Sequence, residues 1–122
     1  MQFNTTEPIY LQIVSHIHHL ILTGRWSDGE RVPSVRDLAV ELEVNPNTVV
    51  RSYTLLQEQG VFENQRGIGY FTAKDAGKRV KSMRRQAFFE EELPALIKTM
   101  KSLDLSVEEL VEHLGAMHET NI

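Results

Sequence analysis

Apolar residues recur at helical spacing near the start of the chain and predict a first helix. The spaced positions between Pro8 and Gly24 are Ile9, Tyr10, Ile13, Ile17, Leu20 and Ile21. Such a 3.6-residue period places the apolar side chains on one face of a helix. Pro8 suits a first helical turn and Gly24 suits the position after the last one, so both ends of this helix are predicted.

A second, shorter helix is predicted after a loop from Arg25 to Pro33. Ser34 and Asp37 have capping-box spacing at its start. Its apolar stripe consists of Val35, Leu38, Ala39 and Leu42. Asn45 followed by Pro46 is the next helix-start signal, because Asn caps free N–H groups and Pro fits the first helical position. Only Glu43 and Val44 separate the two helices.

The third helix is predicted from Pro46 to about Gln59, with Gly60 ending it. Its buried stripe consists of Val49, Ser52, Tyr53 and Leu56, and the opposite side shows Asn47, Val50, Arg51 and Thr54. That side carries a positive charge and no acid until Glu58. Two helices joined by so short a turn, the second with a polar and acid-free front, are typical of a helix-turn-helix.

A β-hairpin is predicted after Gly60, with strands at Val61–Gln65 and Tyr70–Ala73 around Arg66-Gly67-Ile68-Gly69. Taken alone, this segment is simply a tight hairpin. Directly after a helix-turn-helix, it is also where a wing would reach DNA, and glycine at the tip allows a close backbone approach.

The segment beyond the hairpin has two helical patterns that point to a dimerisation tail. Pro94 should kink or break the first pattern near Leu93, and Ser106 with Glu109 form a capping box at the start of the second. So small a tail cannot close a large core alone, so we expect its stripes to pack against a second copy of the chain. The alternative is that the tail helices fold back onto the first helix. The candidate dimerisation residues are Met83, Ala87, Leu93, Leu96, Ile97, Met100, Leu110, Val111 and Leu114.

The charge distribution changes the interpretation of the net charge of −4. Residues 1–85 carry 11 Lys and Arg against 9 Asp and Glu, whereas residues 86–122 carry 2 against 8. The first part is therefore at +2, and a basic face can act on a polyanion locally because salt screens over about 8–10 Å. The basic run Lys78–Arg85 either contacts phosphates or solvates the linker. The run Glu90-Glu91-Glu92 is a solvent-facing or intersubunit polar strip.

Composition and motifs disfavour an enzyme. The chain has 122 residues and no cysteine, so it has room for one modest core and no thiolate chemistry. It shows no P-loop, no nucleophile elbow, no dinucleotide fingerprint and no HExxH spacing. His16 and His19 share a helix face, but surface histidines are the simpler explanation, and we expect neither a metal site nor a cofactor. No apolar run is long enough to span a membrane and no signal peptide is recognisable, so we expect a cytoplasmic protein.

The segments IYLQIVSHI, VPSVRDLA, VNPNTVVRSY, LLQEQG and RGIGYF together resemble the winged helix-turn-helix domain of GntR-family bacterial transcription regulators, over residues 7–73. The short tail resembles that of the YtrA branch of the family. The resemblance implies a mainly α fold with a small β-hairpin wing, organised as a DNA-binding domain at 1–76 and a two-helix dimerisation tail at 77–122. Many family members have arginine at the positions of Pro46 and Val50, so base contacts made by those arginines do not transfer to this chain.

The resemblance also implies a dimeric DNA-binding regulator, most simply a repressor on a palindromic operator. The residues it assigns to DNA are Ser34, Arg36, Asn45, Asn47, Thr48, Arg51, Arg66 and Gly67. Several have alternative roles: Ser34 and Asn45 as helix caps, Thr48 in a backbone contact, Arg36 and Arg51 as solvated cations. A winged-helix protein-interaction module without DNA binding, or a metal- or ligand-responsive variant, is the alternative function. The sequence identifies neither the operator nor an effector.

Overall fold

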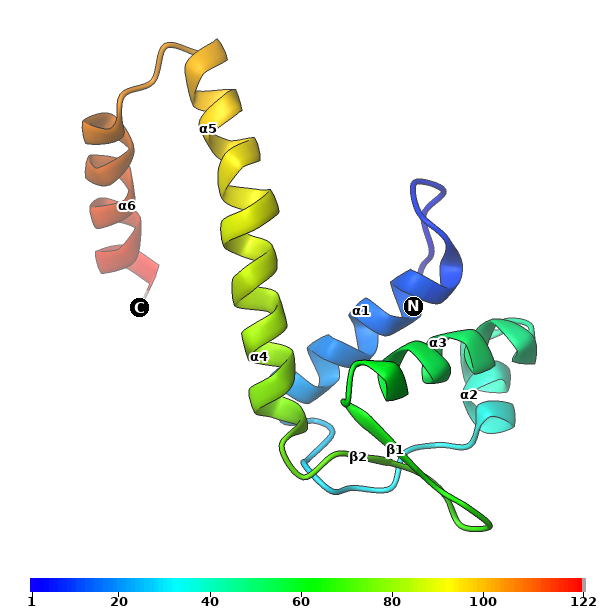
Figure 1. The fold of residues 1–122 in the computed structure, drawn as a ribbon. Coiled ribbons are helices and arrows are strands. Elements are labelled where there is room, and N and C mark those ends of the chain that lie inside the picture. The colour runs from blue at the N-terminus through cyan, green and yellow to red at the C-terminus, as the bar shows by residue number, and fades with distance from the viewer. Residues whose placement is uncertain (122) are drawn as a thin grey trace. The chain divides into compact units, whose positions relative to one another are not determined.

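The computed structural model describes residues 1–121, with side chains as far as His118. Contacts divide the chain into two compact units, residues 1–83 and the residues from Arg84 onward. The first unit contains α1 (Ile9–Leu22), α2 (Val35–Leu42), α3 (Pro46–Glu58), β1 (Phe62–Gln65), β2 (Gly69–Thr72) and the start of α4 (Ala76–Ala87) (Figure 1). The predicted class, mainly helical with a two-stranded antiparallel hairpin, is confirmed.

The helix-start and helix-stop signals have the predicted roles. Pro8 stands just before α1, and Gly24 after it takes a positive φ of 77°. Ser34 and Asn45 are the N-caps of α2 and α3. Helix α3 ends at Glu58, one residue before the predicted end, and Gly60 adopts φ 75° where the chain turns away. Local capping chemistry therefore sets the helix boundaries.

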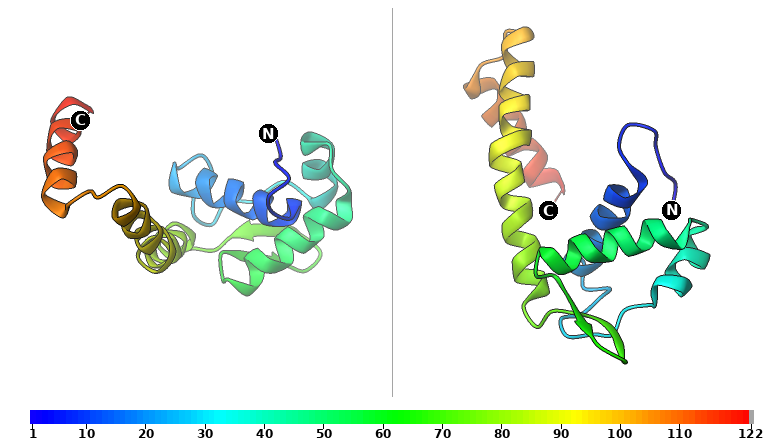
Figure 2. Two further views of the ribbon diagram at one scale, coloured as in Figure 1. Left: turned by 90° about the horizontal axis from the view of Figure 1, so that it is seen from above. Right: turned by 45° about the vertical axis from the view of Figure 1, so that its right-hand side comes forward.

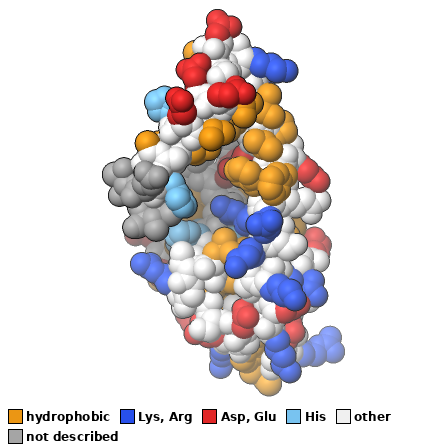
Figure 3. All heavy atoms as spheres, turned by 90° about the vertical axis from the view of Figure 1, so that its left-hand side faces the viewer, with side chains coloured by type: hydrophobic (Ala, Val, Ile, Leu, Met, Phe, Trp, Pro, Cys, Tyr) orange, Lys and Arg blue, Asp and Glu red, His pale blue; other side chains and the backbone are white. Residues whose placement is uncertain are grey.

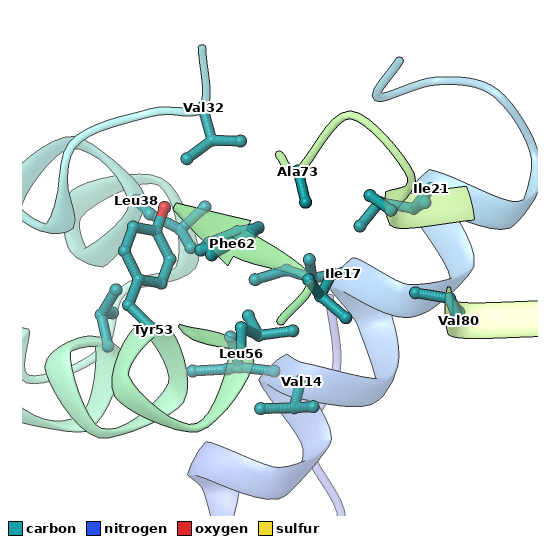
Figure 4. Packing of buried hydrophobic residues seen from close by; sticks show 14 of the residues in the cluster. Val14, Ile17, Ile21, Val32, Leu38, Tyr53, Leu56, Phe62, Ala73 and Val80 are labelled. Carbon is teal, nitrogen blue, oxygen red and sulfur yellow. The ribbon is translucent and has the colours of Figure 1, made fainter. Parts of the chain in front are cut away.

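Helix α3 lies at the centre of the first unit and supplies the middle of its core. Val49, Tyr53 and Leu56 are fully buried on the predicted stripe. Figure 4 shows Tyr53 beside Leu38 and Phe62, with Ile17 extending from α1 toward Phe62. Both views of Figure 2 show α1 and α3 running side by side, and the two helices pack against each other. Burial of these side chains contributes on the order of 1.5–3 kcal/mol each.

Tyr53 also connects the core to the start of α2. Its hydroxyl donates a hydrogen bond of 2.7 Å to the carbonyl oxygen of Pro33. Its ring makes edge contacts with Phe62 and Tyr70, at centroid distances of 4.9 and 5.0 Å. The residue before the α2 cap is therefore fixed from the middle of α3.

The first strand of the hairpin starts one residue later than predicted, the second lies one residue earlier, and a further segment runs beside the hairpin. Phe62 pairs with Thr72 and Gln65 pairs with Gly69, so Val61 and Ala73 lie outside the strands and Gly69 lies inside. The chain before α2, predicted as a plain loop, runs beside β2: Arg31 bridges Phe71, and the Val32 N–H donates to the Tyr70 carbonyl at 3.0 Å. These long-range backbone bonds leave no period in the sequence, which is why they were missed.

The first turns of α4 belong to the first unit. Ala76 and Val80 are fully buried in its core, and Met83 packs against that core. The Gly77 N–H donates to Asp28 Oδ1 at 2.9 Å, which ties the start of α4 to the loop after α1. Met83, a candidate dimerisation residue, is thus already half-covered by its own chain.

In the second unit the chain stays helical through η1 (Phe88–Glu92) and α5 (Leu93–Ser102) before α6 (Val107–Asn121). Segment η1 is a π-helix whose last bond joins the Leu93 N–H to the Phe88 carbonyl. Pro94 has no N–H, and its ring would clash with the carbonyl four residues earlier in a regular α-helix. The predicted interruption near Leu93 is therefore a widened turn rather than a loop, as is common for π-helical insertions.

The tail presents much of its apolar surface to solvent in a single chain. Leu96, Ile97, Val111 and Leu114 are exposed, whereas Ala87, Leu93 and Leu110 are half-buried and Met100 is buried. Among the described residues of the tail, six exposed large apolar residues were not among the candidates: Phe88, Phe89, Leu103, Leu105, Val107 and Met117. A hollow of about 520 Å³ lies between α5 and α6, lined almost entirely by apolar atoms. Figure 3 shows hydrophobic side chains gathered over these helices.

Candidate DNA-binding surface

Local hydrogen bonds form the turn between α2 and α3 and cap the start of α3. Glu43 takes a left-handed conformation with φ 57°, and the Val44 N–H donates to the Ala39 carbonyl at 3.0 Å. Asn45 Oδ1 then accepts the Asn47 N–H at 2.8 Å. The capping role considered for Asn45 is thus present, and its amide oxygen is committed to the helix.

The exposed face of α3 carries the predicted polar residues. Asn47 and Arg51 are exposed, and Thr48 is half-buried. In the described part of the chain the side-chain amide of Asn47 makes no hydrogen bond, so its donor and acceptor remain available. An amide in that state can bond to both N6 and N7 of adenine.

Arg51 stacks on an aromatic residue that is distant in the sequence. Its Cζ atom lies 3.9 Å from the ring centroid of Tyr10, at the start of α1. The buried hydroxyl of Ser52 donates to the Tyr10 carbonyl at 2.8 Å, which fixes this part of α1 on α3. Arg51 is therefore stacked on Tyr10 while it remains exposed to solvent.

A shallow hollow of about 380 Å³ accompanies this stack, lined by Pro8, Ile9, Tyr10, Asn47, Thr48 and Arg51. Tyr10 entered the sequence analysis only as a member of an apolar stripe. The spacing of α1 gave no signal for a contact with Arg51, because that contact spans 41 residues and depends on how two helices cross.

The hairpin tip presents Arg66, Gly67 and Ile68, all exposed. Gly67 adopts φ 78°, which glycine reaches without strain, and the Ile68 N–H closes the turn on the Gln65 carbonyl at 2.9 Å. Arg31 reaches this tip from the chain before α2, and its Nη2 donates to the Ile68 carbonyl at 2.6 Å. Arg31 is a second functional candidate that the sequence analysis missed.

The cations of this surface have no carboxylate partners. Among the described residues the ion pair found is Arg79 with Asp75 on α4, at 2.9 Å. Arg31, Arg36, Arg51 and Arg66 make none, so no carboxylate in the described part of the chain neutralises their charges. Unpaired arginines beside an amide-bearing helix front form a surface suited to phosphates and base edges.

Ser34 and Arg36 complete the set at the front of α2. Ser34 Oγ accepts the Asp37 N–H at 3.1 Å, so this serine caps α2 as the sequence suggested. Arg36 is exposed and lines a hollow between α2 and the hairpin. The predicted DNA-contact residues thus come from the front of α2, the front of α3 and the hairpin tip, and their contacts with DNA remain predictions.

The described residues contain no group of three or more His, Cys, Asp or Glu side chains able to hold a metal ion. Within the same part of the chain, no helix combines the length and the apolar character that crossing a membrane requires.

Fold and surface define a winged helix-turn-helix protein, and comparison with known proteins identifies its family. The family model described as bacterial regulatory proteins, gntR family, matches residues 9–71. The chain belongs to this family of DNA-binding regulators.

Similarity extends beyond the winged domain. The transcriptional regulator YhcF of Bacillus subtilis is 35% identical over 118 residues, which covers 97% of this chain and 96% of that protein. The transcriptional repressor YtrA of the same organism is 33% identical over 108 residues, covering 88% and 82%. A GntR-family regulator from Listeria monocytogenes has a solved structure similar to this one, with a TM-score of 0.79, 32% identity and coverage of 93% and 98%. The chain is therefore similar to small regulators of this family over both of its units.

Proposed function

We propose that the protein is a homodimeric repressor that binds a palindromic operator through the front of α3, with the hairpin as its wing. The observation that carries this proposal is the polar, acid-free front of α3, where, among the described residues, the Asn47 amide has no hydrogen-bond partner and Arg51 has no carboxylate partner. A promoter occupied in this way is closed to polymerase. Similarity to a repressor, YtrA, supports the same direction of control. A regulator of chromosomal genes acts in the cytoplasm.

Asn47 is assigned to base reading and Arg51 to phosphate binding. An amide that bonds to one base edge contributes about 1–3 kcal/mol of discrimination. A phosphate contact instead adds affinity on every sequence. Asn47→Ala should therefore relax base preference, whereas Arg51→Ala should weaken binding to all duplexes alike.

The test uses fluorescence anisotropy on two duplexes, one carrying the region upstream of the gene and one with scrambled sequence, each over a range of salt. Wild-type affinity should fall steeply as salt rises, because phosphate contacts release counterions. The reverse pattern in the two variants would show that the roles are exchanged. A flat salt dependence, or no binding to any upstream fragment, would refute DNA binding by this surface and favour a protein-interaction module.

The dimer is proposed from the uncovered tail. Exposed apolar side chains on α5 and α6 surround a hollow of about 520 Å³, and clustered apolar surface of this kind marks an interaction site. A second copy offers a self-complementary surface under two-fold symmetry. Two winged domains would then meet half-sites about 34 Å apart, or a multiple of that.

The dimer is tested with a charge placed in the exposed stripe of α6. Val111→Glu changes a residue that is 59% exposed in the single chain, so it should leave the fold of each chain intact while opposing the interface. His113→Glu, at an exposed position outside the stripe, is the matched control. Sedimentation equilibrium should give a dimer for wild type and control and a monomer for Val111→Glu. A Val111→Glu dimer of undiminished affinity would exclude this face as the interface.

A further inference from the structure

The charged residues that line the hollow between α2 and the hairpin are all positive. It measures about 340 Å³, and its lining combines Arg31, Ser34, Arg36 and Gly69 with Val32, Val35, Ile68 and Tyr70. No Asp or Glu lines it. Neither arginine pairs with a carboxylate within the described residues. An anion seated in this hollow would find cationic donors and no competing carboxylate.

Arg31 is fixed in the hollow by the hairpin itself. Its backbone bridges Phe71, and its Nη2 donates to the Ile68 carbonyl at 2.6 Å. One N–H of the guanidinium is used in this way, and the planar fork keeps further N–H groups for another acceptor. The carboxylate of the preceding residue, Glu30, accepts the Ser27 N–H at 3.2 Å and does not pair with Arg31.

Gly69 makes room for this arrangement. It adopts φ 145°, and a Cβ at this position would lie 3.2 Å from Nε and 3.3 Å from Nη2 of Arg31. A side chain here would be strained, and the guanidinium would have to shift by a few tenths of an ångström to make room for it. Gly69 therefore has a role distinct from that of Gly67, because it lets the Arg31 guanidinium lie close against the hairpin next to its tip.

We propose that this hollow is the seat of one DNA backbone phosphate, held between Arg31 and Arg36, and that Arg31 joins this phosphate to the wing. The inference rests on the proposed function and adds to it a contact residue and a site. Charge-assisted bonds from arginine to phosphate are short and directional. Occupation of the hollow would hold the wing in one position relative to α2, so the tip would be placed as the duplex docks.

The first experiment compares wild type with Arg31→Met, which keeps side-chain length and removes the charge. Binding to the upstream duplex and to a scrambled duplex is measured between about 50 and 200 mM salt. Arg31→Met should weaken both by about tenfold and lower the salt slope by about 0.9. Lys98→Met removes one exposed positive charge from α5 and is the matched control; its slope should equal that of wild type. Arg31→Lys should restore the slope.

The second experiment separates a direct phosphate contact from an indirect effect on the wing. Single phosphates of the upstream duplex are replaced in turn by uncharged methylphosphonates. At one phosphate in each half-site, the replacement should weaken wild type and leave Arg31→Met and Arg36→Met unchanged. If both variants lose affinity at every position as wild type does, the hollow holds no phosphate. Failure of wild type to bind any upstream duplex would overturn the proposed function as well, whereas wild-type binding without this coupling would overturn the phosphate site alone.

Discussion

The contact between Tyr10 and Arg51 leads to a prediction about how the recognition helix is prepared for DNA. Tyr10→Leu removes the ring under the guanidinium, and Tyr10→Phe keeps the ring and removes the hydroxyl. The bond from Ser52 to Tyr10 goes to the backbone carbonyl, so both variants retain it. The start of α1 therefore stays on α3, and the comparison isolates the ring.

The expected size of the effect follows from the geometry. The Arg51 Cζ atom lies 3.9 Å from the ring centroid, and the arginine is exposed. A cation–π contact at an exposed site contributes about 0.5–1 kcal/mol. Ordering a long side chain on binding costs about 0.5–1.5 kcal/mol, part of which the stack removes in advance. Tyr10→Leu should therefore weaken DNA binding by about 1 kcal/mol, or about fivefold.

A double-mutant cycle with Arg51→Met provides the assay, with dissociation constants from anisotropy on one duplex at fixed salt. Tyr10→Leu should cost about fivefold when Arg51 is present and nothing further in Arg51→Met. Tyr10→Phe should bind like wild type. Equal losses in both backgrounds would refute the reasoning, because the ring would then act on DNA independently of Arg51. A loss in Tyr10→Phe as large as in Tyr10→Leu would assign the effect to the hydroxyl.

Other predictions concern stability, measured by urea unfolding. Asn45→Ala should lower the unfolding free energy by about 1 kcal/mol, because the Asn47 N–H loses its cap, whereas Asn45→Asp should keep most of it. Thr72→Val should cost about 1–3 kcal/mol, since the buried Thr72 hydroxyl donates to the Ser27 carbonyl and its Oγ1 accepts the Glu30 N–H at 2.9 Å, and valine removes both bonds. Burial, followed by the charge of Glu41, raises the pKa of Tyr53 above its ordinary value. Tyr53 therefore ionises first in the unfolded chain, so its contribution to stability should be constant below about pH 10 and should fall above it by up to about 1.4 kcal/mol per pH unit. In Tyr53→Phe the unfolding free energy should fall less above about pH 10 than in wild type. A pH dependence equal to that of wild type would contradict this assignment to Tyr53.

Local and long-range features of the molecule differ in how well the sequence predicts them. The caps at Ser34 and Asn45 follow from residues two or three positions apart, and both bonds are present as predicted. The bond from Arg31 to Ile68 spans 37 residues and depends on the docking of the chain before α2 against β2. Periodicity carries no information about such a contact. The same holds for Tyr10 on Arg51, which needs the crossing of α1 and α3 to be known.

The interruption of the tail helix was predicted in its position but not in its geometry. Pro94 predicts that α-helical bonding fails near Leu93, and it does so there. Whether the chain then turns away or widens into a π-turn depends on how the freed carbonyls find partners. In this molecule the Leu93 N–H bonds to the Phe88 carbonyl and the helix continues. The sequence predicts a helix on each side of Pro94, but it does not predict that a π-helical segment joins them.

In the proposed binding mode, very few side chains at the front of α3 are available to contact base edges. Pro46 has no N–H and an apolar ring, and the side-chain oxygen of Asn45 is bound to the Asn47 N–H. Arg51 stacks on the Tyr10 ring and is assigned to a phosphate. The Asn47 amide is therefore the principal reader of bases in the first turn, supported by the Thr48 hydroxyl. Phosphate binding, by contrast, is shared among Arg31, Arg36, Arg51 and Arg66. Loss of one of these arginines should leave sequence preference intact, whereas loss of the single amide should remove most of it.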